Sequence, residues 1–378
     1  MGGQQRIYHL DALRCFCMLV LVLVLVAVHG ATIGNGWFFI AIKDASDHFR
    51  MATFFLVSGF FTTMVFLRSG VQAFLVNRGR LILIPLASGL VLLNPLTLWL
   101  IQRYHGGGES FSSFFLGGGW RLPLPGPMVW HLHLWFLISL FLYALLTPLL
   151  SALAGSAPVS RAVRWLTGLP GSAGLLLLTL LFGVAVTLLR GLNDAVVTPL
   201  FFQPNAFLPM ATLNYLAYFA IGVLAFRHRD LFDLMHRLFW PGLLLFGAAY
   251  LLHPLFEDQL PRALERVTYW IPRAGFIFLI VCGLMAIARR LVTRGTPMLS
   301  RLTDGVYSFY IFHFLLIYII ANLLRPFTDN VYLTFAVILA AGFPALFLIH
   351  ERVIAPSPLL TLLFNGKAAK QRKVAGPA

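Results

Sequence analysis

The chain has 378 residues, of which 59% are hydrophobic and 11% are charged, and its mean hydropathy is +0.85. Soluble globular proteins carry about 25% charged residues, so this composition excludes that class and predicts an integral membrane protein. The net charge of +15 does not indicate nucleic acid as a partner, because Lys and Arg stand in short segments between apolar runs, without a basic helix or an aromatic RNA-binding pattern. It indicates orientation by cytoplasmic positive charge and contact with membrane lipids.

Apolar runs of about 20 residues, the length of a helix that crosses the bilayer core, recur along the whole chain. Length and periodicity predict ten spans, at roughly 12–33, 49–68, 81–101, 132–152, 172–190, 208–226, 238–255, 268–288, 305–324 and 331–350. The predicted fold class is all-α, a polytopic integral membrane protein with one membrane domain over residues 1–366. The tail, residues 367–378, is polar and basic and is predicted to be disordered in the cytoplasm.

The positive charges predict that both ends of the chain are cytoplasmic. That orientation places 19 of the 28 Lys and Arg residues inside, as expected for a multi-pass protein of a bacterial inner membrane. The nine that fall outside are Lys43, Arg50, Arg103, Arg121, Arg190, Arg262, Arg266, Arg273 and Arg325.

Most of the first span lies in the segment HLDALRCFCMLVLVLVLVAVHGA, residues 9–31. No small-residue cleavage site follows this long run, so we interpret it as a retained helix rather than a signal peptide. Asp11 and Arg14 stand at its cytoplasmic end and His29 at the other. Its two cysteines, like Cys282, lie in apolar runs without a disulfide or metal pattern and are predicted to be small buried hydrophobes.

His29 is the first candidate for chemistry, since a neutral imidazole can take a proton from an alcohol. A role as an interfacial residue is the alternative. Arg14 lies fifteen positions earlier, roughly 22 Å along an ideal helix and offset by about 60°, so both side chains can face one groove without touching. Asp11 and Arg14 would then meet an anionic donor that arrives from the cytoplasm.

The second span opens with Asp47, His48 and Arg50 on its outer side and is interrupted by Ser58-Gly59. Arg50 is either an interfacial anchor or a carboxylate clamp, because Arg can bind a carboxylate with two parallel hydrogen bonds. For Gly59 we favour close packing between helices.

Two further segments place ionisable residues in or near spans. WHLHLWFLISL (130–140) carries His133 and Trp135. Its two histidines, His131 and His133, stand at i, i+2 and do not share a helix face, and no Cys, Asp or Glu completes a zinc site, so no metal is predicted. YSFYIFHFLL (307–316) places His313 in the middle of a span, where a buried structural histidine and a site residue are both open interpretations. GxSxG, P-loop and HExxH motifs do not occur in the sequence.

Taken in order, several segments resemble the membrane acyltransferase 3 family. They are LDALR with His29, FRMATFFLVSGFF (49–61), FLVNRGRLILIPL (74–86), HLWFLISL (133–140), YFAIGVLAF (218–226) and YSFYIFHFLLIY (307–318). Within the family, FRM before the Ser-Gly pair and the ending HERVIAPSPLLTLLFNGK (350–367) are most similar to the glucan biosynthesis protein C type, which succinylates periplasmic glucans.

The resemblance implies transfer of an acyl group, with succinyl favoured, from cytoplasmic acyl-CoA to a hydroxyl of an extracytoplasmic glycan acceptor. It implies no permanently bound cofactor, since acyl-CoA is the donor substrate. His29 matches the catalytic histidine of the first helix and Arg14 its partner arginine. The other matching positions, with roles in substrate binding, are Asp11, Arg50, Ser58, Arg78, Arg80, His133, Trp135 and His313.

One feature departs from the family pattern. Fourteen residues, CFCMLVLVLVLVAV, separate Arg14 from His29. This is about four residues, or one helical turn, more than the family usually has between these two positions. The excess lengthens the axial gap by roughly 6 Å and turns the facing by about 40°. Either a local bulge absorbs it or the site geometry differs.

Two other functions compete with acyl transfer on physical grounds. A transporter or flippase for a glycan or lipid would also have many helices with intramembrane His and Arg, although the internal repeats and paired broken helices of transporters are not evident. A receptor or scaffold needs no polar residues in its spans and is disfavoured.

Overall fold

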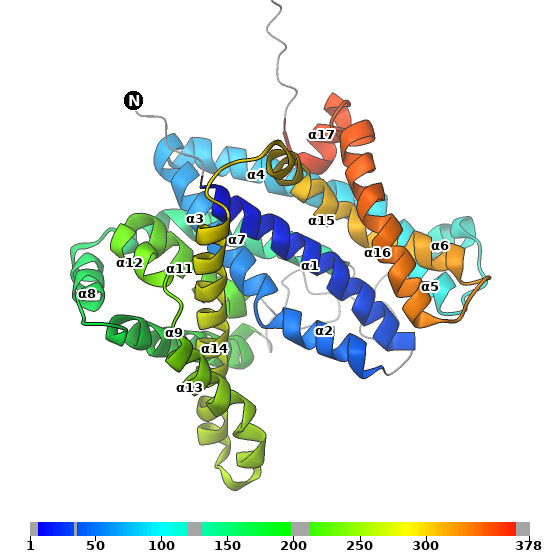
Figure 1. Cartoon of the computed structure of the whole chain (residues 1–378). Coiled ribbons are helices and arrows are strands. Elements are labelled where there is room, and N and C mark those ends of the chain that lie inside the picture. Colours follow the sequence, from blue (N-terminus) through cyan, green and yellow to red (C-terminus); the bar gives the residue numbers. More distant parts are fainter. Residues whose placement is uncertain (1–6, 34–35, 120–130, 198–211, 368–378) are drawn as a thin grey trace, which may run out of the picture. The chain divides into compact units, whose positions relative to one another are not determined.

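In the computed structural model, residues 7–33, 36–119, 131–197 and 212–367 are described, with side chains except those of Leu21, residues 25–33 and Val197 (Figure 1). Every regular element in these residues is a helix. This agrees with a membrane protein, because a helix satisfies its own backbone hydrogen bonds where no water is available.

The chain divides into two compact units, which are described separately. Unit 1 comprises residues 1–74 and 142–303. Its main helices are α1 (Tyr8–Ile33), α2 (Trp37–Asp47), α3 (Arg50–Ser69), α8 (Ala157–Thr167), α9 (Ala173–Leu192), α11 (Leu216–Arg227), α12 (Arg229–Met235), α13 (Trp240–Leu251) and α14 (Arg262–Leu291). Short turns η3 (Asn193–Val197) and η4 (Leu213–Tyr215) extend α9 and lead into α11.

Unit 2 comprises residues 75–141 and 304–378. It contains most of α4 (Val71–Ser88), η1 (Gly89–Leu93), α5 (Asn94–Tyr104), α6 (Phe111–Gly117), η2 (Leu132–Leu134), the first part of α7 (Trp135–Ala154), most of α15 (Pro297–Leu324), α16 (Val331–Leu348), η7 (Ile349–Ile354) and α17 (Pro358–Asn365).

Two glycines allow α3 and α11 to approach closely in unit 1. A Cβ atom at Gly59 would overlap the backbone of Phe219, and one at Gly222 would overlap the backbone of Leu56. Small residues allow such close approach of two membrane helices. The predicted packing role of Gly59 is confirmed.

Aromatic side chains also pack in the core of unit 1. Phe182 of α9 stacks on Phe278 of α14 with ring centroids 4.5 Å apart. Phe55 of α3 lies edge-on to Tyr143 at 5.2 Å, and both are almost fully buried. The predicted burial of the cysteines is confirmed as well, since Cys15, Cys17 and Cys282 are buried and free.

In unit 2, α15 is tied to its neighbours by buried polar groups. Asn322 donates to the carbonyl of Leu100 at 2.9 Å. At the other end of α15, the Ser308 hydroxyl lies 2.9 Å from Asn365 Oδ1 and 3.0 Å from His350 Nδ1, which joins α15 to α17 and η7. All three side chains of this cluster are buried.

Among the described residues, seven helical segments are long and apolar enough to cross a membrane, or eight if the pair α12–α13, bent by 69°, forms one span. Helix α1, with 26 residues, is roughly 39 Å long and also exceeds the bilayer core of about 30 Å. The chain is therefore a multi-pass membrane protein.

Several predicted spans differ from the observed helices in their limits. The predicted second span, 49–68, matches α3, although the membrane-length segment that contains it also includes the preceding helix α2 and so begins at Trp37. The third is interrupted by the π-helical turn η1, just before Pro95. Of the sixth, residues 208–211 lie outside the described residues, and α11 itself has 12 residues.

Candidate functional site

Arg14 is held at the beginning of α1 by an acidic neighbour one turn away. Its Nη1 lies 3.8 Å from Asp11 Oδ1, and its guanidinium carbon lies 5.6 Å from the ring centroid of Phe61 on α3. Asp11 is buried, whereas the Arg14 side chain keeps 29% of its surface exposed. A partly exposed cation of this kind can meet an anion at the helix end.

His29 lies in the last part of α1, and its side chain is outside the described residues. The helix itself is α-helical without interruption from Tyr8 to Ile33. No bulge absorbs the extra turn between Arg14 and His29, so their separation along the helix stays roughly 22 Å. Of the two alternatives, the backbone supports a changed site geometry.

Arg50 stands at the beginning of α3, beside the first third of α1. Its Nη2 lies 3.2 Å from Asp47 Oδ1, and its Nη1 donates to Ser46 Oγ at 3.2 Å. The neighbouring Phe49 stacks on Phe16 of α1 with centroids 6.0 Å apart. Ser58, two turns further along α3, is half-buried.

Arg78 and Arg80 face different directions from α4, as residues two positions apart on a helix must. Arg78 is half-buried and interacts electrostatically with Tyr307 of α15, while Arg80 is exposed. The structure therefore does not bring these two predicted site residues together.

His133 and His313 meet inside unit 2, although 180 positions separate them. Their ring centroids lie 4.8 Å apart with the planes at 75°, and His313 is fully buried. The Tyr310 hydroxyl donates to the carbonyl of His133. Trp135 begins α7 two residues later and is half-buried.

A second pair of histidines joins the beginning of α1, before the predicted span, to the residue that follows α12. His9 Nε2 is 3.1 Å from Nε2 of His236, whose Nδ1 lies 2.7 Å from the carbonyl of Phe232. That carbonyl accepts the Nδ1 proton, so Nε2 of neutral His236 accepts from His9. Burial, with a smaller repulsion from His236, lowers the pKa of His9 to about 4, and burial also lowers the pKa of His236.

A pocket of about 220 Å³ opens within unit 1, between α2, α3, α9, η4, α11 and α14. We call it the arginine pocket. It is lined by Asp47, Ala52, Val186, Arg190, Asn214, Tyr215, Tyr218, Trp270, Arg273, Ala274 and Ile277.

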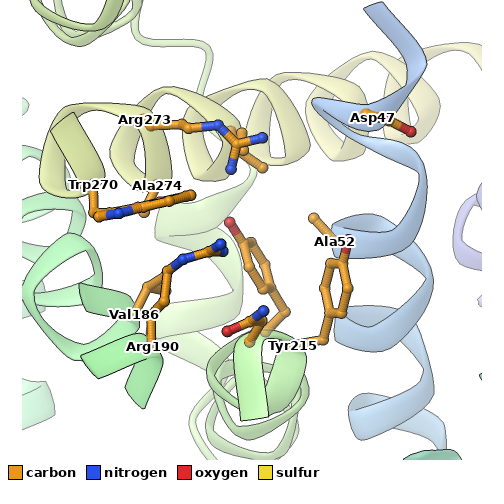
Figure 2. A pocket seen from close by; sticks show the side chains of 11 residues that line it. Asp47, Ala52, Val186, Arg190, Tyr215, Trp270, Arg273 and Ala274 are labelled. Carbon is orange, nitrogen blue, oxygen red and sulfur yellow. The ribbon is translucent and has the colours of Figure 1, made fainter. Parts of the chain in front are cut away.

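Two arginines reach into this pocket from opposite helices, Arg190 from α9 and Arg273 from α14 (Figure 2). The Arg190 guanidinium carbon lies 3.6 Å from the centroid of the Trp270 ring, and that of Arg273 lies 5.1 Å from the same ring. Stacking on an aromatic face orients a guanidinium while leaving its edge donors available. The arrangement suits an anion.

The sequence interpretation had not singled out Arg190, Arg273, Trp270 or Asn214. The sequence does contain one indication of a functional role for these arginines: Arg50, Arg190 and Arg273 are three of the nine positive residues predicted on the outer side. Charges that run against the orientation rule are candidates for function. Among the described residues, no group of three or more His, Cys, Asp or Glu side chains could hold a metal ion.

Comparison with known proteins gives a match over nearly the whole chain. The family model described as "Acyltransferase domain" matches residues 7–349. The chain is 24% identical to Glucans biosynthesis protein C of Escherichia coli over 396 aligned positions, which cover 98% of this chain and 97% of the relative. It is 25% identical to the protein of the same name from Salmonella typhimurium, with 97% of each covered. No solved structure matches.

Proposed function

Because the chain belongs to the acyltransferase family, we propose that it transfers a succinyl group from acyl-CoA to a hydroxyl of an extracytoplasmic glucan. The chain is a membrane acyltransferase for groups other than aminoacyl groups. The similarity to the glucan biosynthesis proteins supports a glucan as the acceptor. Family membership disfavours the transporter and scaffold alternatives.

The proposed orientation is that of ten spans in a bacterial inner membrane with both ends cytoplasmic, so the domain of residues 1–366 is followed by a cytoplasmic tail. The excess of positive charge on the inner side supports it. In this orientation Arg14 faces the donor side, and His29 lies towards the acceptor side of the same helix.

One observation carries the chemical proposal: α1 is a single unbroken helix with Arg14 at one end and His29 near the other. His29 acts as the general base on the acceptor hydroxyl. The hydroxyl oxygen attacks the thioester carbonyl, an ester C–O bond forms and the C–S bond breaks. The proton passes from the hydroxyl through His29 to the CoA thiolate, so no covalent acyl-enzyme is needed.

The remaining predicted residues have supporting roles in this proposal. Arg14, oriented by Asp11, and Arg78 and Arg80 attract the phosphates of CoA, because guanidinium groups pair with phosphate through two hydrogen bonds. The other proposed substrate-binding residues are Arg50, Ser58, His133, Trp135 and His313, of which Arg50 could pair with the distal carboxylate of a succinyl donor. The gap between Arg14 and His29 is one helical turn longer than is usual in the family. The thioester therefore has to enter the membrane domain roughly one turn deeper to reach His29.

The test is acyl transfer by the purified protein in lipid nanodiscs, with succinyl-CoA and a glucan oligosaccharide, and with the ester detected by mass spectrometry. His29→Ala should lower the rate at least about 100-fold, the usual contribution of a general base. His105→Ala, an exposed histidine at the end of α5, is the matched control and should retain the wild-type rate. Wild-type activity in His29→Ala would overturn the assignment of the base.

A second comparison tests the acyl group. Acetyl-CoA offered in place of succinyl-CoA should give slower transfer. Equal rates with both donors would overturn the preference for succinyl, and the absence of transfer from either donor by the wild-type protein would overturn the proposed function.

A further inference from the structure

The arginine pocket holds two positive charges that face one another. Arg190 and Arg273 both contact Trp270. Asp194, one turn beyond Arg190, attracts it electrostatically, but among the described residues neither arginine forms an ion pair within 4 Å of a carboxylate oxygen. Like charges at short range in a poorly solvated site repel one another. An anion bound between them would remove that repulsion and accept hydrogen bonds from both guanidinium groups.

The single carboxylate in the pocket does not supply this anion. Asp47 already pairs with Arg50 at 3.2 Å and with Lys43 at 3.5 Å. Arg273 Nε, a donor, is buried without a hydrogen-bond partner among the described residues, and so is Asn214 Oδ1, an acceptor that could take a ligand hydroxyl. The balance of the pocket is positive, and its donors suit a planar carboxylate, which Arg can bind with two parallel hydrogen bonds.

The pocket lies away from the reacting end of α1. Phe49, two residues after Asp47, stacks on Phe16 of α1, whereas His29 lies thirteen residues beyond Phe16, roughly 20 Å along the helix axis. A four-carbon diacid is far shorter than that distance. The pocket therefore does not hold the distal carboxylate of an acyl group that is being transferred at His29.

We propose that the arginine pocket binds a carboxylate carried by the glycan acceptor, several sugar units away from the hydroxyl that reacts. This inference rests on the proposed function: each transfer of a diacid acyl group forms an ester through one carboxyl and leaves the other free on the glycan. The pocket therefore recognises a glycan that has already been acylated. Arg190 and Arg273 bind the carboxylate, and Trp270 positions them.

The experiment measures equilibrium binding to the full chain in nanodiscs, without acyl-CoA. The probes are an unsubstituted glucan oligosaccharide, the same oligosaccharide bearing succinate half-esters, free succinate and inorganic phosphate. The wild-type protein should bind the succinylated oligosaccharide at least about tenfold more tightly than the unsubstituted one, as expected for hydrogen bonds to a charged group. Arg190→Gln and Arg273→Gln should each abolish this difference, whereas Arg266→Gln, an exposed arginine on α14, should retain it.

The thermal unfolding midpoint of each variant shows whether that variant is folded. Arg273→Lys is a second variant at this position, and it keeps the positive charge. Equal affinity of the wild-type protein for the two oligosaccharides would overturn the proposal, as would a preference that persists in both pocket variants. Free succinate or phosphate binding as tightly as the succinylated oligosaccharide would instead make the pocket a general anion site. Loss of the preference when phosphatidylcholine nanodiscs are replaced by phosphatidylglycerol nanodiscs would identify a lipid headgroup as the occupant.

The same measurement separates this proposal from the proposed function. His29→Ala should bind the succinylated oligosaccharide as the wild-type protein does, although it does not transfer acyl groups. Binding preference without any transfer by the wild-type protein would reject the function and not the pocket, whereas transfer without a binding preference would reject the pocket alone.

Discussion

Arg190 lies against the face of Trp270, with its guanidinium carbon 3.6 Å from the centre of the indole ring. Eighty positions separate the two residues, and they come from α9 and α14, which pack closely in unit 1 (Figure 1). The contact holds one of the two pocket cations in a defined direction and so reduces the entropy that would be lost when an anion binds.

Replacement of Trp270 tests this positioning role. Trp270→Leu should weaken binding of the succinylated oligosaccharide roughly fivefold, since an exposed to partly desolvated cation–π contact contributes about 1 kcal/mol. Trp270→Phe keeps an aromatic face and should recover most of the affinity. Isothermal titration in nanodiscs measures both, and equal losses in the two variants would show that the aromatic face is not what matters.

The glycine contact between α3 and α11 should control the stability of unit 1. Gly59→Ala places a methyl group against the backbone of Phe219, and backbone cannot move aside as a flexible side chain can. We expect destabilisation of about 1–3 kcal/mol, seen as a lower thermal unfolding midpoint in detergent. Gly191→Ala in α9, which has open space around it, is the control, and an equal midpoint in both variants would contradict the packing role.

The histidine pair at the beginning of α1 should make stability depend on pH. Burial lowers the pKa of His9 to about 4, below the ordinary value of about 6.5 that it has in the unfolded chain. The unfolded state therefore binds more protons between these values, so stability is fully present above pH 6.5 and is lost as the pH falls towards 4. The unfolding midpoint should drop over this window.

His9→Phe removes one titrating group of the pair and should flatten that decline. His105→Ala, at an exposed site, should leave the wild-type pH profile unchanged. An unaltered decline in His9→Phe would mean that other groups are responsible.

The buried cluster of Ser308, His350 and Asn365 should stabilise unit 2. Ser308→Ala leaves His350 Nδ1 and Asn365 Oδ1 without the hydroxyl that each contacts at about 3 Å. Leaving a buried polar group without its partner costs about 1–3 kcal/mol, so the midpoint of unfolding should fall. Ser112→Ala on α6, at an exposed position, should change the midpoint little. Equal midpoints in the two variants would contradict a stabilising role of the buried cluster.

Much of the architecture follows from local sequence. Long apolar runs predict membrane helices because lipid offers the backbone no hydrogen bonds. Gly59 was predicted to allow close helix packing and does so against α11. The predicted second span, 49–68, coincides with α3, but the separate helix α2 before it was not predicted, because Lys43 and Asp47 interrupt its apolar pattern.

The candidate site, like the fold, could be predicted only in part from the sequence. The sequence alone determined that Arg14 and His29 stand at the two ends of one membrane helix, since both lie within a single apolar run whose geometry is local. Only the tertiary structure decided that His133 meets His313 and that Arg190 and Arg273 share Trp270. These contacts join helices that are far apart in the chain, and helix periodicity specifies which face of a helix is apolar but not which other helix packs against it.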